Sequence, residues 1–357
     1  MKRIELYLKN FLLKLLVLFN PVEKQLQNPV FSSNSNILFI RLNRIGDALV
    51  TTPLLFEIKK AIGCHIFVLA DKKNHFVFRN NPSIDEVIIY SKGLKGFFSI
   101  NQIIKDRAID AVVDLHDDVS TTVSYLIALA KTKYKLGLKK SNYTIYTNVT
   151  ERLDSKSNHV IDRILKLSEL FNLKIDYNSV SVRFYPTDVE NKIATEQIKQ
   201  MNADNKFLVG VNISAGSEAR FWGVENYQKL LQTLSKFNVR VILFCPPKDL
   251  HYALEITSEE NIYPVTESFG IFAAAILNLN ILITPDTSIV HIASIKKIPV
   301  FGLYVKYNTT DMVWSPYQTD FEYVETTEPT LKNISFTEVE KKLNPFLEKY
   351  IHAKRSS

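Results

Sequence analysis

A chain of 357 residues, 46% of them hydrophobic, is long enough to form two domains of ordinary size with cores of their own. Its net charge of +7 favours anionic partners such as nucleotide phosphates or lipid headgroups. The sequence has no basic block with interleaved aromatic residues, so no nucleic-acid partner is expected. Cys64 and Cys245 lie far apart and lack the spacing of metal ligands, which favours a reducing, cytoplasmic setting.

The first 19 residues, "MKRIELYLKNFLLKLLVLF", predict a basic amphipathic helix. One face carries the apolar side chains Ile4, Leu8, Phe11, Leu15 and Leu18. The basic side chains that lie largely away from this face are Lys2, Arg3, Lys9 and Lys14. Charges interrupt the apolar run, no small-residue cleavage site follows, and the run is too short to span a bilayer. Two interpretations remain open: a helix lying on an anionic membrane surface, and a helix packed on the protein itself.

From residue 37 onward, short apolar strands alternate with amphipathic helices, which predicts parallel sheets covered on both faces. A strand and then a helix are expected within 37–63. In the rest of the first half, the expected strands are 65–70, 86–90, 110–115 and 134–138, and the expected helices are 119–130 and 158–172. Turn formers and charges cluster at 176–192, after which the alternation restarts. In the second half, the expected strands are 207–214, 239–245, 262–266, 280–284 and 298–304, and the expected helices are 224–236, 248–257, 269–277 and 288–296.

These patterns predict two doubly wound units, with ligands bound in a cleft at the facing carboxyl ends of their strands. The expected regions are a helix and linker (1–30), an N-terminal domain (31–185), a C-terminal domain (186–335) and a final helix and tail (336–357). No G-x-G-x-x-G follows a predicted strand and no G-x-x-x-x-G-K-[ST] is present, which excludes a dinucleotide fingerprint and a P-loop.

The first stretch that carries chemistry is "ILFIRLNRIGDALVTTPLL", at the junction of a strand and a helix. Gly46 is expected to adopt a backbone conformation closed to other residues and to let a ligand approach. Asp47 follows at the expected start of the helix. A carboxylate in this place is either a catalytic group or a helix cap.

Two further stretches predict a phosphate site. In "ILITPDTSIVHIASIKK", Asp286, Thr287 and Ser288 open a helix, and His291 lies about one turn further on. Free N–H groups and the helix dipole at such a start suit a diphosphate, although a simple cap with a packed histidine is an equal alternative. In "GVNISAGSEARFWGVENY", the small residues Ser214, Gly216 and Ser217 follow a strand.

Arg220, in the same stretch, is expected either to neutralise a leaving phosphate or to be an ordinary surface arginine. Taken together and in this order, the three stretches resemble glycosyltransferase family 9, the heptosyltransferases of lipopolysaccharide core assembly and their relatives. The resemblance runs from about residue 37 to residue 305, and the N-terminal basic helix lies outside it.

The resemblance implies a GT-B fold, in which two Rossmann-like doubly wound domains face a central cleft. It implies an inverting glycosyltransferase that needs no metal and no cofactor and moves a heptose or related sugar from a nucleotide-sugar, here expected to be ADP-linked. The family's proposed general base matches Asp47, and its donor-binding motif matches Asp286, Thr287 and His291. The family glycine of that motif is Ser288 here, which is expected to crowd or redirect the diphosphate.

Less direct matches complete the expected site. Arg220 is assigned to the phosphate, and Asp249 to the donor ribose, where the family often has an acidic residue. Residues expected to meet the acceptor or line the cleft are Arg44, Gly46, Thr51, Thr52 and His116. His116 belongs to "DLHDD", which resembles a metal-binding D-x-D but ends a strand in the half away from the donor. No metal ligand is therefore expected.

The expected acceptor is a saccharide or glycolipid of the cell surface, such as lipopolysaccharide. The expected location is the cytoplasm, peripheral to the inner face of the membrane if the N-terminal helix binds lipid. Two other functions remain open, namely a sugar-nucleotide epimerase or hydrolase on the same fold, and a non-catalytic protein that binds sugar-nucleotides or glycans. The last helix, 335–354, is expected to kink at Pro345 and to cross back to the first domain, as in many GT-B proteins.

Overall fold

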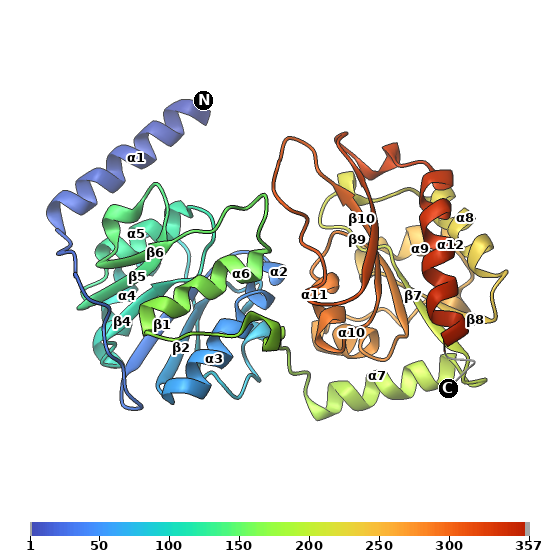
Figure 1. Cartoon of the computed structure of the whole chain (residues 1–357), viewed down its shortest axis with the longest axis horizontal. Coiled ribbons are helices and arrows are strands. Elements are labelled where there is room, and N and C mark those ends of the chain that lie inside the picture. Colours follow the sequence, from blue (N-terminus) through green and yellow to red (C-terminus); the bar gives the residue numbers. More distant parts are fainter. Residues whose placement is uncertain (1, 354–357) are drawn as a thin grey trace. The chain divides into compact units, whose positions relative to one another are not determined.

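The computed structural model describes residues 2 to 353, apart from the side chains of 2–7, 10, 94 and 353 (Figure 1). The described residues form two compact units, one up to Phe184 and the other from Tyr185. Each unit is a parallel sheet with helices around it and has its own core.

The first unit contains a six-stranded sheet in the order β3-β2-β1-β4-β5-β6, and every neighbouring pair is parallel. The strands are β1 (Asn36–Arg41), β2 (His65–Ala70), β3 (Glu86–Ile89), β4 (Ala111–Asp114), β5 (Tyr134–Lys139) and β6 (Asn148–Glu151). The strand order reverses between β1 and β4. Open α/β sheets bind ligands beyond the carboxyl ends of the strands at such a switch point.

The helices of the first unit are α1 (Lys2–Phe19), α2 (Ile45–Leu49), α3 (Thr52–Ile62), α4 (Leu94–Asp106), α5 (Thr121–Leu129) and α6 (Val160–Leu165). Short 3₁₀ turns are η1 (His75–Val77), η2 (Tyr143–Ile145), η3 (Lys166–Phe171) and η4 (Tyr177–Ser179). The central strands are buried on both faces, and every residue of β4 is buried. That double burial explains why these strands are continuous apolar runs and do not alternate with polar residues.

The second unit contains a five-stranded parallel sheet in the order β11-β10-β9-β7-β8. Its strands are β7 (Phe207–Asn212), β8 (Val239–Phe244), β9 (Ile281–Pro285), β10 (Val300–Val305) and β11 (Phe321–Thr326). Read from β8, this order is 2-1-3-4-5, a common doubly wound arrangement whose switch point lies between β7 and β9. Two of the three motif stretches contain the carboxyl ends of these two strands and continue past them.

The helices of the second unit are α7 (Asp188–Met201), α8 (Val224–Leu234), α9 (Leu250–Ile256), α10 (Phe269–Ile276), α11 (Ile289–Ile295) and α12 (Phe336–Ala353). Its 3₁₀ turns are η5 (Glu218–Arg220), η6 (Pro247–Asp249), η7 (Glu259–Asn261) and η8 (Leu331–Asn333). The last helix, α12, which was expected to cross back to the first domain, packs within the second unit. Its apolar side chains Val339, Leu343 and Leu347 are buried in the core of the second unit, where α12 packs against α8 and β11.

Most of the expected elements are present, but residues 262–266 do not form a strand. In that segment only Ile262 makes a bridge, to Leu243, because Pro264 in the middle cannot donate a ladder hydrogen bond. The expected helix 158–172 begins as α6 and continues as the tighter η3. The expected break contains the start of α7, where Thr187 and Glu190 form a capping box.

Helix α1 packs on the first unit through a face that the sequence pattern did not single out. Leu13, Leu16 and Val17 pack against the core beneath α5, and the Tyr125 hydroxyl donates a hydrogen bond to the carbonyl of Lys9 at 2.9 Å. The predicted apolar face stays largely outside, with Leu8 59% and Leu18 71% exposed. The side chains of Ile4, Lys2 and Arg3, which belong to the same prediction, lie outside the described residues.

Candidate active site

The candidate site of the first unit contains Asp47, which lies in the short helix α2 just after β1. Its Oδ1 accepts a hydrogen bond from Nη2 of Arg41 at 2.6 Å, and its side chain is 22% exposed. Oδ2 accepts no bond from any residue in the described range 2–353. Asp47 does not cap the helix, because the N-cap is Arg44 and no side chain bonds there. The capping alternative is thus not supported.

The sharp turn before Asp47 is made by Asn43 and not by Gly46. Asn43 has φ 92°, in the region that favours glycine, whereas Gly46 lies inside α2 and is not among the residues with positive φ. The expectation of a special conformation at Gly46 is therefore wrong. Asparagine tolerates the left-handed region better than most residues. The turn folds α2 back over the end of β1 and brings Asp47 to Arg41.

A buried ionic cluster lies at the same edge of the sheet. The carboxylate of Asp114, at the end of β4, accepts bonds from Nζ of Lys140 at 2.8 Å and from the Tyr146 hydroxyl at 2.6 Å. It also accepts from the main-chain N–H of His116 at 2.9 Å. Burial alone would raise the pKa of Asp114, but Lys140 and His116 hold it well below its usual value. The cluster thus holds an ionised carboxylate inside the fold.

Three residues expected to meet the acceptor are interior. His116 is buried, with Nδ1 2.8 Å from Asp114 Oδ1 and Nε2 3.2 Å from the carbonyl of Leu42. Thr51 and Thr52 are also buried, and their hydroxyls donate to the α2 carbonyls of Ala48 and Leu49. In this structure the ring and both hydroxyls bond within the fold and do not reach the surface, which gives no support to the expected contact with the acceptor or the cleft. Arg44, by contrast, is exposed.

The candidate site of the second unit lies at the carboxyl ends of β7 and β9. Arg220 in η5 and Asp286 after β9 meet there, with Nη2 3.1 Å from Oδ2 and Nη1 3.2 Å from the Asp286 carbonyl. Both side chains are partly exposed. The structure therefore brings together two residues that are 66 positions apart in the sequence. Arg220 is not an isolated surface arginine.

Asn212, the last residue of β7, connects the hydroxyl groups of this edge. Its Nδ2 donates to Thr284 Oγ1 at 2.9 Å and to Thr287 Oγ1 at 3.4 Å, and its Oδ1 accepts from the Ser214 hydroxyl at 2.6 Å. A buried amide between two strand ends holds Ser214 and Thr287 in place. Asn212 was not among the predicted site residues, although its position near the end of the predicted strand 207–214 was a usable signal.

The remaining donor-side residues surround this edge. Ser288 is the N-cap of α11 and makes no side-chain cap bond, and His291 is buried with its ring 6.0 Å from that of Trp314. Gly216 and Ser217 are exposed in the loop before η5.

Asp249 stands beside the same loop. Nζ of its neighbour Lys248 lies 3.4 Å from the carbonyl of Ala215 and 3.9 Å from Asp249 Oδ2. Burial raises the pKa of Asp249. A half-buried carboxylate and a lysine thus flank the hydroxyl-rich loop, and Lys248 is a second cation that was not among the predicted site residues.

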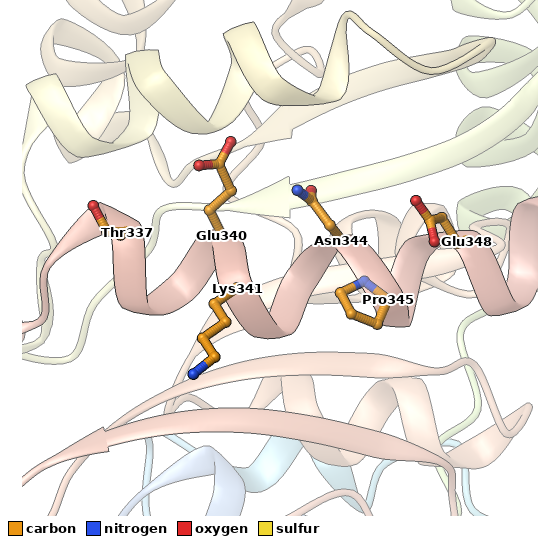
Figure 2. A pocket seen from close by; sticks show the side chains of 6 residues that line it. All are labelled: Thr337, Glu340, Lys341, Asn344, Pro345 and Glu348. Carbon is orange, nitrogen blue, oxygen red and sulfur yellow. The ribbon is translucent and has the colours of Figure 1, made fainter.

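Two other observations concern the described part of the chain as a whole. A hollow of about 460 Å³ lies along α12 and is lined by Thr337, Glu340, Lys341, Asn344, Pro345 and Glu348 (Figure 2). All of these belong to one helix and none belongs to the carboxyl edge of a sheet. In residues 2–353, no three His, Cys, Asp or Glu side chains gather as a metal site would require, and no described helix is both long and apolar enough to cross a membrane.

Comparison with known proteins gives a consistent result. The model of glycosyltransferase family 9 (heptosyltransferase) matches residues 97–344. A lipopolysaccharide core heptosyltransferase, OpsX of Haemophilus influenzae, is 22% identical over 81% of this chain and 87% of its own. The crystal structure of a family 9 glycosyl transferase from Veillonella parvula matches with a TM-score of 0.73 at 22% identity, over 90% of this chain and 99% of that one. Escherichia coli heptosyltransferase WaaC, solved with ADP, matches with a TM-score of 0.66 at 15% identity, over 88% and 99%.

Proposed function

This chain belongs to glycosyltransferase family 9 (heptosyltransferase) and has the GT-B fold, and we propose that it is an inverting, metal-independent enzyme of lipopolysaccharide core assembly. In this proposal it moves a heptose or related sugar from an ADP-linked donor to a lipopolysaccharide acceptor. The observation that carries the proposal is the carboxylate of Asp47, which Arg41 holds at the switch point of the first sheet and which remains partly exposed.

The chemistry follows from what an inverting displacement needs. The acceptor hydroxyl attacks the anomeric carbon from one face while the nucleoside diphosphate leaves from the other. Asp47 takes the proton of the hydroxyl. Its Oδ2 is the oxygen that accepts this proton, because Oδ1 is bonded to Arg41. The departing negative charge calls for a cation and hydrogen-bond donors, which Arg220, Thr287 and Ser288 supply.

The choice of nucleotide rests on relatives. WaaC was solved with ADP, and the curated relative is named a lipopolysaccharide core heptosyltransferase. In our proposal Asp249 binds the ribose of the donor, next to the loop of Ser214, Gly216 and Ser217. His291 packs behind the diphosphate.

Calorimetric titration with ADP, UDP, GDP and CMP, followed by turnover of the matching sugar donor with and without a lipopolysaccharide acceptor, tests this function. We expect ADP to bind and sugar transfer to require the acceptor. Donor consumption without an acceptor would replace the proposal by an epimerase or hydrolase. Tight binding without turnover in either condition would replace it by a non-catalytic binding protein.

Changing Arg220 to glutamine is expected to raise the Kd for the nucleoside diphosphate about tenfold, or about 1.4 kcal/mol, because a cation that pairs with phosphate is lost. Arg240→Gln is the matched control. Arg240 lies near the amino end of β8, and its guanidinium binds Asn261 and the carbonyl of Glu260. Calorimetry with ADP compares the two variants. Equal affinities for both would exclude Arg220 from the phosphate site.

We also propose that α1 binds the enzyme to the anionic inner face of the membrane, where a lipid-linked acceptor is presented. The outer face of α1 exposes Leu8, Phe11, Leu12, Leu18 and Phe19, all 45% exposed or more. Residues 1–30 carry five basic and two acidic side chains, which gives a net charge of +3. An amphipathic helix with this charge sign suits a surface of anionic lipid.

Replacing Phe11, Leu18 and Phe19 together by glutamate is expected to abolish sedimentation with vesicles of phosphatidylcholine and phosphatidylglycerol. The fold should persist, because the packing residues Leu13 and Leu16 are untouched.

The control variant changes Phe98, Val189 and Leu254, which are also exposed, to glutamate and thus alters the net charge equally. We expect this control to sediment like the wild type. If the α1 variant also sediments like the wild type, α1 is not the membrane contact.

A further inference from the structure

Arg41 is the last residue of β1, and its side chain is only 2% exposed. All three of its guanidinium nitrogens donate hydrogen bonds. Nε binds the carbonyl oxygen of Asp47 at 2.8 Å, Nη2 binds Oδ1 of the same residue at 2.6 Å, and Nη1 binds the carbonyl of Leu115 at 2.9 Å. Arg41 therefore holds both the main chain and the side chain of Asp47.

The third bond of Arg41 crosses the switch point of the sheet. Leu115 follows β4, whereas Asp47 follows β1, so one guanidinium joins the two segments that border the proposed site. The main chain of Arg41 is itself held, because Nδ2 of Asn74 donates to its carbonyl at 3.2 Å. The turn at Asn43 returns α2 to this guanidinium. The Asp47 carboxylate is thus attached to a rigid element at one oxygen.

We propose that Arg41 is a positioning residue that aims the Oδ2 oxygen of Asp47 at the acceptor hydroxyl without touching either sugar. This inference rests on the proposed function, in which Asp47 is the general base. A base must be held to within a fraction of an ångström of its productive position. The planar fork of arginine presents separate nitrogens in a fixed geometry, so it fixes a carboxylate oxygen, a carbonyl and a second segment relative to one another, whereas the donors of a lysine ammonium all rotate about one nitrogen.

A double-mutant cycle in kcat tests the inference, with the variants Arg41→Gln, Asp47→Asn and both together. We expect Arg41→Gln to lower kcat by about 10- to 100-fold, with the KM values for donor and acceptor changed by less than about threefold. If Arg41 acts through Asp47, the double variant should be no slower than Asp47→Asn alone. Arg41→Lys should recover part of kcat, since one bond to Asp47 can be kept.

Arg163→Gln is the matched control, because Arg163 is also 2% exposed and pairs with Asp117 at 2.9 Å but makes no bond to Asp47. If Arg163→Gln lowers kcat, its fold-loss and that of Asp47→Asn should multiply in the variant that carries both changes. Losses from Arg41→Gln and Asp47→Asn that multiply in the same way would overturn the inference and leave Asp47 as the base. A wild-type kcat in Asp47→Asn would instead refute the proposed base. If Arg41→Gln does not fold, Arg41→Lys replaces it in the cycle with the same criteria.

Discussion

Replacing Asp47 by asparagine is expected to lower kcat by about 10²–10⁴-fold, the usual contribution of a general base. Asparagine keeps the size of the side chain but cannot accept the proton of the acceptor hydroxyl. The affinity for ADP should not change, because in our proposal the nucleotide binds the second unit, which has its own sheet and core. Steady-state kinetics and calorimetry with ADP on the same preparation measure the two effects separately.

Asp118→Asn is the control for this experiment. Asp118 is also in the first unit and follows β4, but its side chain is 91% exposed, and its ion-pair partner is Arg152 at 3.6 Å. We expect kcat of this variant to match the wild type. If Asp47→Asn keeps a wild-type kcat, the general base is another group and the mechanism proposed above fails.

Replacing Lys140 by methionine is expected to destabilise the first unit by about 3–5 kcal/mol, because it leaves a buried carboxylate without its cation. Both partners are interior, with Lys140 3% and Asp114 1% exposed. Nζ of Lys140 also donates to the carbonyls of His116 at 2.6 Å and Asp118 at 3.3 Å, so the change breaks bonds to two further carbonyls. The cluster joins β4 and the end of β5, next to the segment that Arg41 binds.

The adjacent residue provides the control. Lys139 pairs with Glu151 at 2.6 Å, but both side chains are largely exposed. Such surface pairs contribute little to stability, so Lys139→Met should unfold like the wild type.

Urea unfolding followed by two signals locates the effect. Both tryptophans, Trp222 and Trp314, belong to the second unit, so their fluorescence reports that unit, whereas circular dichroism reports both. A dichroism transition of Lys140→Met at the wild-type urea concentration would contradict the prediction.

The loss of stability caused by Lys140→Met should also depend on pH. The pKa of Asp114 in the folded protein is below its unfolded value of about 3.9, so the ionised group contributes stability that is present above that value and is lost as the pH falls below it. Without Lys140, burial raises this pKa, and the neutral acid is then tolerated at low pH. We therefore expect the difference in unfolding free energy between wild type and variant to be largest near neutral pH and to shrink as the pH falls. A difference that grows on acidification would exclude Asp114 as its source.

The predictions that held came from short-range patterns. Apolar runs such as 37–41 and 207–214 became β1 and β7, because a strand buried on both faces needs nothing but apolar side chains. The strands β6 and β11 were missed. β6 carries the polar residues Asn148, Thr150 and Glu151, and β11 lies at an edge of its sheet, where burial demands less of the sequence.

The candidate site was only partly visible in the sequence. Motif order indicated Asp47, Arg220 and Asp286, since these lie in the loops or turns that follow predicted strands. It also suggested Thr51 and His116, whose side chains turn out to be buried and bound by the fold. A sequence lists which residues follow a strand, but the direction of each side chain depends on turns such as the one at Asn43.

The sequence by itself determined the family, the two doubly wound units and the edge of each sheet at which chemistry is expected, because these follow from local apolar periodicity and from motifs at strand ends. Tertiary structure alone decided the partners. The pairing of Arg41 with Asp47, of Arg220 with Asp286 and of Lys140 with Asp114 depends on which strands become neighbours. It likewise decided that α1 packs by one face and leaves its predicted apolar face outside. The role of a charged residue or of an apolar face depends on the residues that lie beside it in the fold. These residues are distant in sequence or belong to another element.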